Sequence, residues 1–277
     1  MCKIFKVSTS SYYLWLKGTI SKRWFFNEKL SILIQHIFKD SFESYGAPRI
    51  KTALEELGYN VSIPKVARIM RALGLYAQRT RKFKVTTDSN HNYPVAPNVL
   101  AQNFKVERVN QVWVSDITYI ETKQGWMYLT VVIDLFNRKI VGWSMSDNLT
   151  VEATILPAFR MASKSVKLTE KLIFHSDRGS QYASSKFKNL LKTHNELIIQ
   201  SMSRKGNCWD NAVAESFFKS LKVEWVYKHK YNYRSEAELS VFQWIETWYN
   251  RRRIHSTLGN KSIMQFEKEM NQYNVAA

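Results

Sequence analysis

The chain has 277 residues, with 41 lysines and arginines against 23 aspartates and glutamates, and a formal net charge of +18. A hydrophobic fraction of 45% excludes a largely disordered chain, and the length allows one or two domains with a buried core. No apolar run approaches the ~20 residues that span a bilayer. The two cysteines, Cys2 and Cys208, are too few for a disulfide framework or a thiolate zinc site. We expect a cytoplasmic protein with no membrane contact, whose basic surface meets a polyanion such as nucleic acid.

Positive charge is densest near the N-terminus, where the first 100 residues hold 16 basic and 6 acidic side chains. Apolar residues at helical spacing predict helices within residues 27–75, broken at Gly46 and Gly58. Two short helices joined by a tight turn have the form of a helix-turn-helix DNA reader, although small helical bundles share this pattern. The second of these helices carries the basic residues Lys65, Arg68 and Arg71.

A polar stretch follows the helices and contains the basic cluster Arg79, Arg81, Lys82 and Lys84. We therefore predict a helical DNA-binding region over 1–78 and a basic, polar linker over 79–108. Residues 109–270 would form a second domain together with the C-terminal helices.

The pattern of elements changes after the linker. Strands are expected at 112–120, 127–136, 139–146, 171–177 and 196–200, and helices at 151–165, 183–194, 210–227 and 236–249. Strands first, then helices and strands in alternation, predict an α/β fold with a mixed sheet flanked by helices.

Three carboxylates lie at positions that suggest a functional role. Asp116 interrupts a strand, Asp177 ends one, and Glu215 shares a helical stripe with Lys219 and Lys222. A carboxylate inside a strand is costly unless it is paired or binds a metal. Hard oxygen ligands favour Mg²⁺ or Mn²⁺, and two such ions would suit phosphoryl transfer. Taken singly, each residue could equally be a turn former, an ion-pair partner or a solvated helix residue.

Four blocks occur in order along the chain: WVSDITYI, YLTVVIDLFNRKIVGWSMS, HSDRGSQY and SMSRKGNCWDNAVAESFFKSLKVE. They closely resemble the second-reading-frame transposases of bacterial insertion sequences of the IS-three family. YGAPRI, LGYNVSIPKVARIMRALGL and WYNRRRIHSTLG extend the resemblance over nearly the whole chain. The resemblance implies a ribonuclease-H-like integrase catalytic core behind the N-terminal helix-turn-helix segment. It also implies an Asp-Asp-Glu triad of Asp116, Asp177 and Glu215 that binds two Mg²⁺ (or Mn²⁺) ions.

The spacing of the triad departs from the family. Asp177 and Glu215 are separated by 37 residues, two more than is usual, and a short loop near His194 could absorb the difference. The family's proline after the C-terminal signature is replaced by Ile263. Asp210 is the other possible third ligand, but it has the position of a helix N-cap, so we prefer Glu215.

Several further residues have less decisive patterns. His175 could form a hydrogen bond near the metal site or be a structural histidine. Trp209 and Trp225 could be core residues or base-stacking platforms, and we expect them in the core. Phosphate contacts are expected from Lys65, Arg68, Arg71, Lys205, Lys219, Lys222, Arg251 and Arg252.

The resemblance therefore implies a transposase that cleaves a DNA strand at the element end and joins its 3′-hydroxyl to another phosphodiester. The implied partners are double-stranded DNA (terminal inverted repeats and target), the first-reading-frame protein of the element and further copies of this chain. We expect it in the cytoplasm, associated with the nucleoid. Two alternatives are a DNA-binding regulator that has lost catalysis and a ribonuclease-H-type nuclease.

Overall fold

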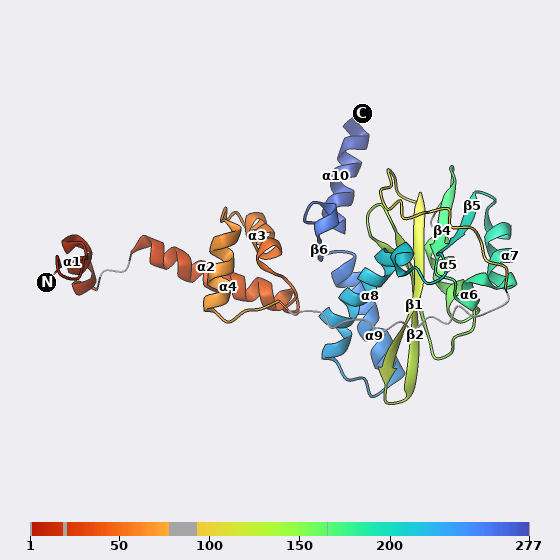
Figure 1. Ribbon diagram of the computed structural model, residues 1–277, viewed down its shortest axis with the longest axis horizontal. Helices are drawn as coiled ribbons and strands as arrows, with labels where there is room; N and C mark the ends of the chain where they lie inside the picture. The colour runs from red at the N-terminus through yellow and green to blue at the C-terminus, as the bar shows by residue number, and fades with distance from the viewer. Residues whose placement is uncertain (1, 19–20, 78–92, 165, 277) are drawn as a thin grey trace. The chain divides into compact units, whose positions relative to one another are not determined.

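The computed structural model describes residues 2–18, 21–77, 93–164 and 166–276, drawn in colour in Figure 1. The chain divides into two compact units, Met1–Gln78 and Arg79–Ala277. The basic cluster at 79–84 lies outside the described residues. Within the described ranges, no helix is both long enough and apolar enough to cross a membrane.

The first unit is helical, as the sequence predicts. It contains α1 (Thr9–Leu16), α2 (Lys22–Asp40), α3 (Ala47–Glu56) and α4 (Ile63–Ala72). The core is made of one apolar side of each of the last three helices: Leu30, Ile34, Phe38, Ile50, Leu54, Val66 and Met70. Gly58, with φ of +83°, turns the chain after α3 in a conformation that a side chain would strain. The two short helices α3 and α4 pack against each other and against α2.

The second unit is built on one five-stranded sheet. Its strands are β1 (Val112–Thr122), β2 (Gly125–Asp134), β3 (Ile140–Ser146), β4 (Leu172–Ser176) and β5 (Ile198–Met202). They lie in the order β3-β2-β1-β4-β5. The first three strands pair antiparallel, whereas β4 pairs parallel with both β1 and β5. The predicted mixed sheet is confirmed.

Helices cover both faces of this sheet. Figure 1 shows α5 (Ile155–Ser163) and α7 (Ser185–His194) on one side and α8 (Ala212–Glu224) and α9 (Arg234–Gln243) on the other. Trp113, Phe159, Phe174 and Phe187 meet in the core beneath α5 and α7. The opposite face is covered by the buried side of α8, which consists of Ala214, Phe217, Phe218 and Leu221.

All four helices predicted for this unit have different limits in the structure. The helix expected over 151–165 spans only Ile155–Ser163. The helix expected over 183–194 is split at Ser184, whose extended backbone ends α6 (Ser180–Ala183) and whose hydroxyl caps α7. The 210–227 helix begins only at Ala212, after the 3₁₀ turn η1 (Cys208–Asn211), and is followed by η2 (Val226–Lys228). The last predicted helix continues from α9 as the π-helix η3 (Trp244–Tyr249). The chain then forms β6 (Ile254–His255), η4 (Ser256–Leu258), β7 (Lys261–Ser262) and α10 (Ile263–Ala276).

Part of the predicted linker packs on the second unit. The amides of Val99 and Leu100 donate to the Ser201 hydroxyl at 2.9 and 3.2 Å. Leu100 is only 3% exposed. Because these contacts tie residues 93–108 to β5, this stretch belongs structurally to the second unit, and the predicted domain limits remain a prediction.

We expect Gly142→Ala to destabilise the second unit by about 1–3 kcal/mol, the usual cost of overpacking a close-packed interior. A β-carbon at Gly142 on β3 would lie 2.7 Å from the Ala162 amide nitrogen of α5, closer than real contacts allow. Thermal unfolding measures the loss.

Gly46→Ala is the matched control, since a β-carbon there would meet only Pro48 at 3.8 Å. Equal melting temperatures for the two variants would show that α5 does not press against β3 in this way.

Candidate active site

Two aspartates become neighbours because of how β1 and β4 pair. The two strands run parallel, and their register ends with Ser115 opposite Ser176. The next residue along each strand is Asp116 and Asp177. Neighbouring strands are about 4.8 Å apart, and residues at matched positions point to the same face of a sheet. The pairing therefore places both carboxylates side by side, at the carboxyl end of β4.

Backbone amides hold both aspartates in place. The Ile117 amide donates to Asp116 Oδ1 at 2.8 Å, and the Gly179 amide donates to Asp177 Oδ1 at 2.9 Å. Arg178 Nε anchors the same turn by donating to the Ser203 carbonyl at 2.6 Å. The turn after β4 thus fixes the position of one carboxylate relative to the other.

The third candidate, Glu215, lies in the first turn of α8 and is half-buried. The buried side of α8 packs the helix against the sheet, and Asn211 Nδ2 donates to the Ser115 carbonyl at 3.3 Å. This contact ties the start of α8 to β1 at the residue before Asp116. The helix therefore presents Glu215 on the same face of the sheet as the two aspartates.

Electrostatics link the three carboxylates. Burial, then the charge of Asp177 and, more weakly, that of Glu215 raise the pKa of Asp116 well above its ordinary value. The Ile117 amide and the Lys222 ammonium act in the opposite direction. Burial also raises the pKa of Glu215. Crowded negative charge of this kind is what a bound cation relieves.

The carboxylate oxygens suit a hard divalent ion, but they do not form a complete set of metal ligands. Among the described residues, no three His, Cys, Asp or Glu side chains gather as a group that would hold a metal. Asp116 and Asp177 are adjacent through the sheet, whereas Glu215 acts on them at longer range. The assignment of the full triad therefore remains a prediction.

Known families match the chain in three places. An HTH-like domain matches residues 26–83, and an integrase core domain matches residues 106–208 and again 197–262. The chain is 42% identical to the insertion element IS600 uncharacterized 31 kDa protein of Shigella sonnei, over 98% of this chain and 99% of that protein. It is 41% identical to transposase InsF for insertion sequence IS3A of Escherichia coli (strain K12), over 97% of this chain and 93% of that protein. The chain belongs to the IS3 family of transposases.

An IS3-family transposase with an integrase core is a polynucleotidyl transferase that cleaves DNA and transfers the strand. The chain also resembles a simian T-cell lymphotropic virus intasome in complex with PP2A regulatory subunit B56 gamma (TM-score 0.47, 18% identity, 78% of this chain and 69% of that chain). A second similar structure is the HTLV-2 integrase catalytic core domain in complex with magnesium in its dimeric form (TM-score 0.43, 20% identity, 57% of this chain and 96% of that chain).

Asp210 does not cap α8, contrary to the prediction. It is fully buried and accepts hydrogen bonds from Arg204 Nη2 at 2.8 Å, Gln102 Nε2 at 2.7 Å and Asn98 Nδ2 at 2.9 Å. Arg204 holds the pKa of this carboxyl well below its usual range. These partners outcompete the free amides of α8, so Asp210 clamps the transposase's β5–α8 loop to residues 98–102. Its partners also exclude it as the third metal ligand.

The prediction that Trp209 belongs to the core is wrong. The residue is 71% exposed on η1, next to the clamp of Asp210. His175, by contrast, is fully buried, and its Nδ1 lies 2.9 Å from the Ser201 hydroxyl. Burial lowers the pKa of His175 to about 4, so the ring is neutral at pH 7 and has a structural role.

The basic residues expected at phosphates lie in different settings. Lys65 is half-buried with its ammonium 4.6 Å from the centre of the Phe26 ring. Lys222 is half-buried, and burial lowers its pKa although the charge of Asp116 acts in the opposite direction, which places Lys222 beside the carboxylates. The others are exposed at the surface: Arg68, Arg71, Lys205, Lys219, Arg251 and Arg252.

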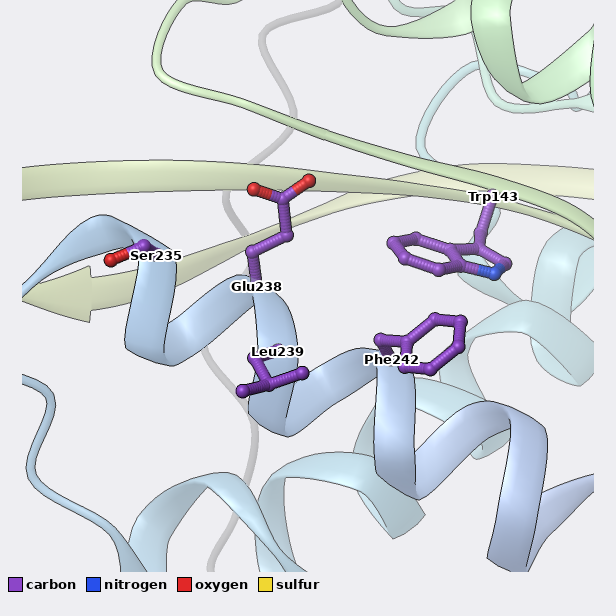
Figure 2. Close-up of a pocket in the computed structure, with 5 residues that line it drawn as sticks. All are labelled: Trp143, Ser235, Glu238, Leu239 and Phe242. Atoms are coloured by element: carbon purple, nitrogen blue, oxygen red, sulfur yellow. The ribbon is translucent and has the colours of Figure 1, made fainter.

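A shallow cavity lies away from the carboxylates. Figure 2 shows its lining, Trp143 of β3 with Ser235, Glu238, Leu239 and Phe242 of α9. The Trp143 and Phe242 rings are 6.0 Å apart. None of the three candidate carboxylates lines this cavity, so it is not the catalytic site.

We expect Asp116→Asn to raise the melting temperature of the metal-free protein near pH 7. The pKa of Asp116 is higher in the folded than in the unfolded chain, so stability is lost as the pH rises from the unfolded towards the folded value. The amide removes that loss. A gain of about 1 kcal/mol corresponds to about 2–4 °C, measurable by calorimetry in EDTA.

The gain should shrink as the pH falls through the raised pKa of Asp116 in the folded protein, because the carboxyl then takes up a proton. Mg²⁺ should raise the melting temperature of the wild type more than that of the variant. Asp147→Asn, which removes a half-exposed carboxylate paired with Arg234, is the control and should show neither effect. A variant less stable than the wild type in EDTA would contradict the account of crowded charge.

Proposed function

We propose that Asp116, Asp177 and Glu215 are the catalytic carboxylates of this transposase and that they hold two divalent ions, Mg²⁺ or Mn²⁺. The observation that carries the proposal is the parallel pairing of β1 and β4, which sets Asp116 beside Asp177. The bound ions would activate the attacking oxygen and stabilise the leaving oxygen at the scissile phosphate.

The three residues contribute differently to such a site. Asp116 and Asp177 are positioned by the sheet and by the amides of Ile117 and Gly179. Glu215 has no hydrogen bond that holds its carboxylate among the described residues and keeps contact with solvent, so its side chain can rotate towards the pair. Lys222 offsets part of the negative charge beside Asp116 and is within reach of a phosphate brought there.

DNA would be held by both units. The exposed Arg68 and Arg71 project from α4 opposite its buried residues Val66 and Met70, which suits a helix that enters a groove. Contacts to the scissile strand would come from the second unit, Arg79–Ala277, which we call the catalytic unit. The residues that would make them are Lys205, Lys219, Lys222, Arg251 and Arg252.

The partners and place of action follow from the family. The duplex would carry the terminal inverted repeats of the element, and a second duplex would be the target. The first-reading-frame protein and further copies of this chain would complete the assembly, in the cytoplasm at the nucleoid. The 41% identity to transposase InsF supports these assignments. We propose the same domain limits as above: residues 1–78 bind DNA, residues 79–108 form the linker and residues 109–270 carry out catalysis.

Replacing any one of the three carboxylates by its amide should reduce cleavage and joining about 10³-fold or more. The loss corresponds to the several kcal/mol of charge stabilisation that metal ions supply in a transition state. The substrate is a duplex carrying the terminal sequence of the element, with Mg²⁺, and products are resolved on a sequencing gel.

The amide variants should bind the same duplex nearly as well as the wild type. Asp147→Asn, an acidic residue at the surface, is the control and should keep full activity. Full activity in Asp177→Asn would remove that residue from the site and with it the mechanism. Cleavage of an RNA–DNA hybrid in place of the duplex would favour the nuclease alternative.

Removing the charges of Arg68 and Arg71 together should weaken DNA binding and flatten its salt dependence. Each lost phosphate contact reduces the slope of log K against log salt by about 0.9. Fluorescence anisotropy over a salt series gives the slope. Lys51→Ala, which removes a lysine paired with Glu55 on α3, is the control. An unchanged slope in the double variant would place the main DNA contacts outside α4.

A further inference from the structure

Trp209 is the most exposed tryptophan of the described part of the catalytic unit. It is 71% exposed, whereas Trp113 and Trp244 are each 1% exposed. Burying a large apolar side chain stabilises a protein, and the free protein lacks that stabilisation at Trp209. An aromatic ring held in solvent is a common device for contacting a partner.

The backbone around Trp209 is anchored although its ring is not. The Trp209 amide donates to Asn207 Oδ1 at 3.1 Å. The next residue, Asp210, is fully buried and bonded to Arg204, Gln102 and Asn98. The ring is therefore presented from a fixed turn.

This turn lies beside the catalytic carboxylates. Asn211, two residues after Trp209, bonds to the carbonyl of Ser115, which precedes Asp116. Glu215 follows in the first turn of α8. Exposed lysines flank the turn in sequence, Lys205 before it and Lys219 after it. Sites that stack unpaired bases combine an exposed aromatic ring with basic residues that follow the nucleic-acid backbone, and this turn has the ring and has lysines before and after it in the sequence.

We propose that Trp209 is a stacking platform for an unpaired nucleobase at the DNA end from which the strand is cut. The inference rests on the proposed function, since it takes the carboxylates to be the place where the phosphate reacts. Stacking would hold the base out of the duplex and so bring the scissile phosphate to Asp116 and Asp177.

The first test is a double-mutant cycle in which the Trp209 ring, the nucleobase or both are removed. On an intact duplex end, Trp209→Ala should lower cleavage about 5- to 150-fold, the equivalent of the 1–3 kcal/mol per stacked base. Trp209→Phe should recover most of this activity. On an end with an abasic position in place of the stacked base, wild type and Trp209→Ala should be equal.

Trp126→Ala is the matched control. Trp126 is 51% exposed, and its partner Glu121 lies five residues from Asp116 along β1, about 16 Å away. This variant should cleave the intact end like the wild type. All variants should keep the melting temperature and the salt dependence of binding, which excludes misfolding as the cause. Equal losses for Trp209→Ala on intact and abasic ends would overturn the proposal.

The second test does not need catalysis. 5-Iododeoxyuridine is placed at each terminal position of the duplex in turn, and the complex in EDTA is irradiated and mapped by mass spectrometry. One position should give an adduct at Trp209, even in the Asp177→Asn variant, because stacking does not require a competent metal site. Absence of an adduct at Trp209 from every position would overturn the stacking platform and leave the carboxylate mechanism standing. Full cleavage by Asp177→Asn would remove the mechanism instead.

Discussion

The parallel pairing of β1 with β4 is the constraint on which the catalytic unit depends. It brings together Asp116 and Asp177, which are far apart in sequence, and gives each a backbone amide that fixes its direction. Two carboxylates at strand spacing repel one another, and burial strengthens the repulsion. The fold therefore carries a local energetic cost when no cation is bound, and a divalent cation bound by the two aspartates, as proposed above, would relieve that cost.

A second set of polar contacts positions α8 over this pair. Asp210 is clamped between Arg204 and two amides from residues 98–102, and Asn211 reaches the backbone of β1. Before the helix begins, the loop between β5 and α8 is thus hydrogen-bonded both to residues 98–102 and to β1. One consequence is that Glu215 emerges on the same face as the aspartates. Another is that the hydrogen-bonded turn keeps the Trp209 ring exposed to solvent.

The sequence predicts what depends on local pattern and on the family motifs, and fails where distant residues decide. The apolar run at 127–136 predicts the central strand β2, and four ordered motifs predict the family. Asp210 looks like an N-cap from its neighbours, but its partners in the structure are Arg204, six positions before it, and Asn98 and Gln102, which stand 112 and 108 positions away in the chain. Trp209 looks like a core residue because tryptophan is apolar, and only the clamp beside it explains its exposure. The joint role of the three carboxylates is still a prediction.

Anomalous diffraction from crystals of the protein soaked in Mn²⁺ tests the central claim most directly, because it locates the ions without assuming any activity. We expect Mn²⁺ to be bound by Asp116 and Asp177 together, with Glu215 turned towards the ion. Manganese bound elsewhere while these two aspartates remain without a cation would contradict it.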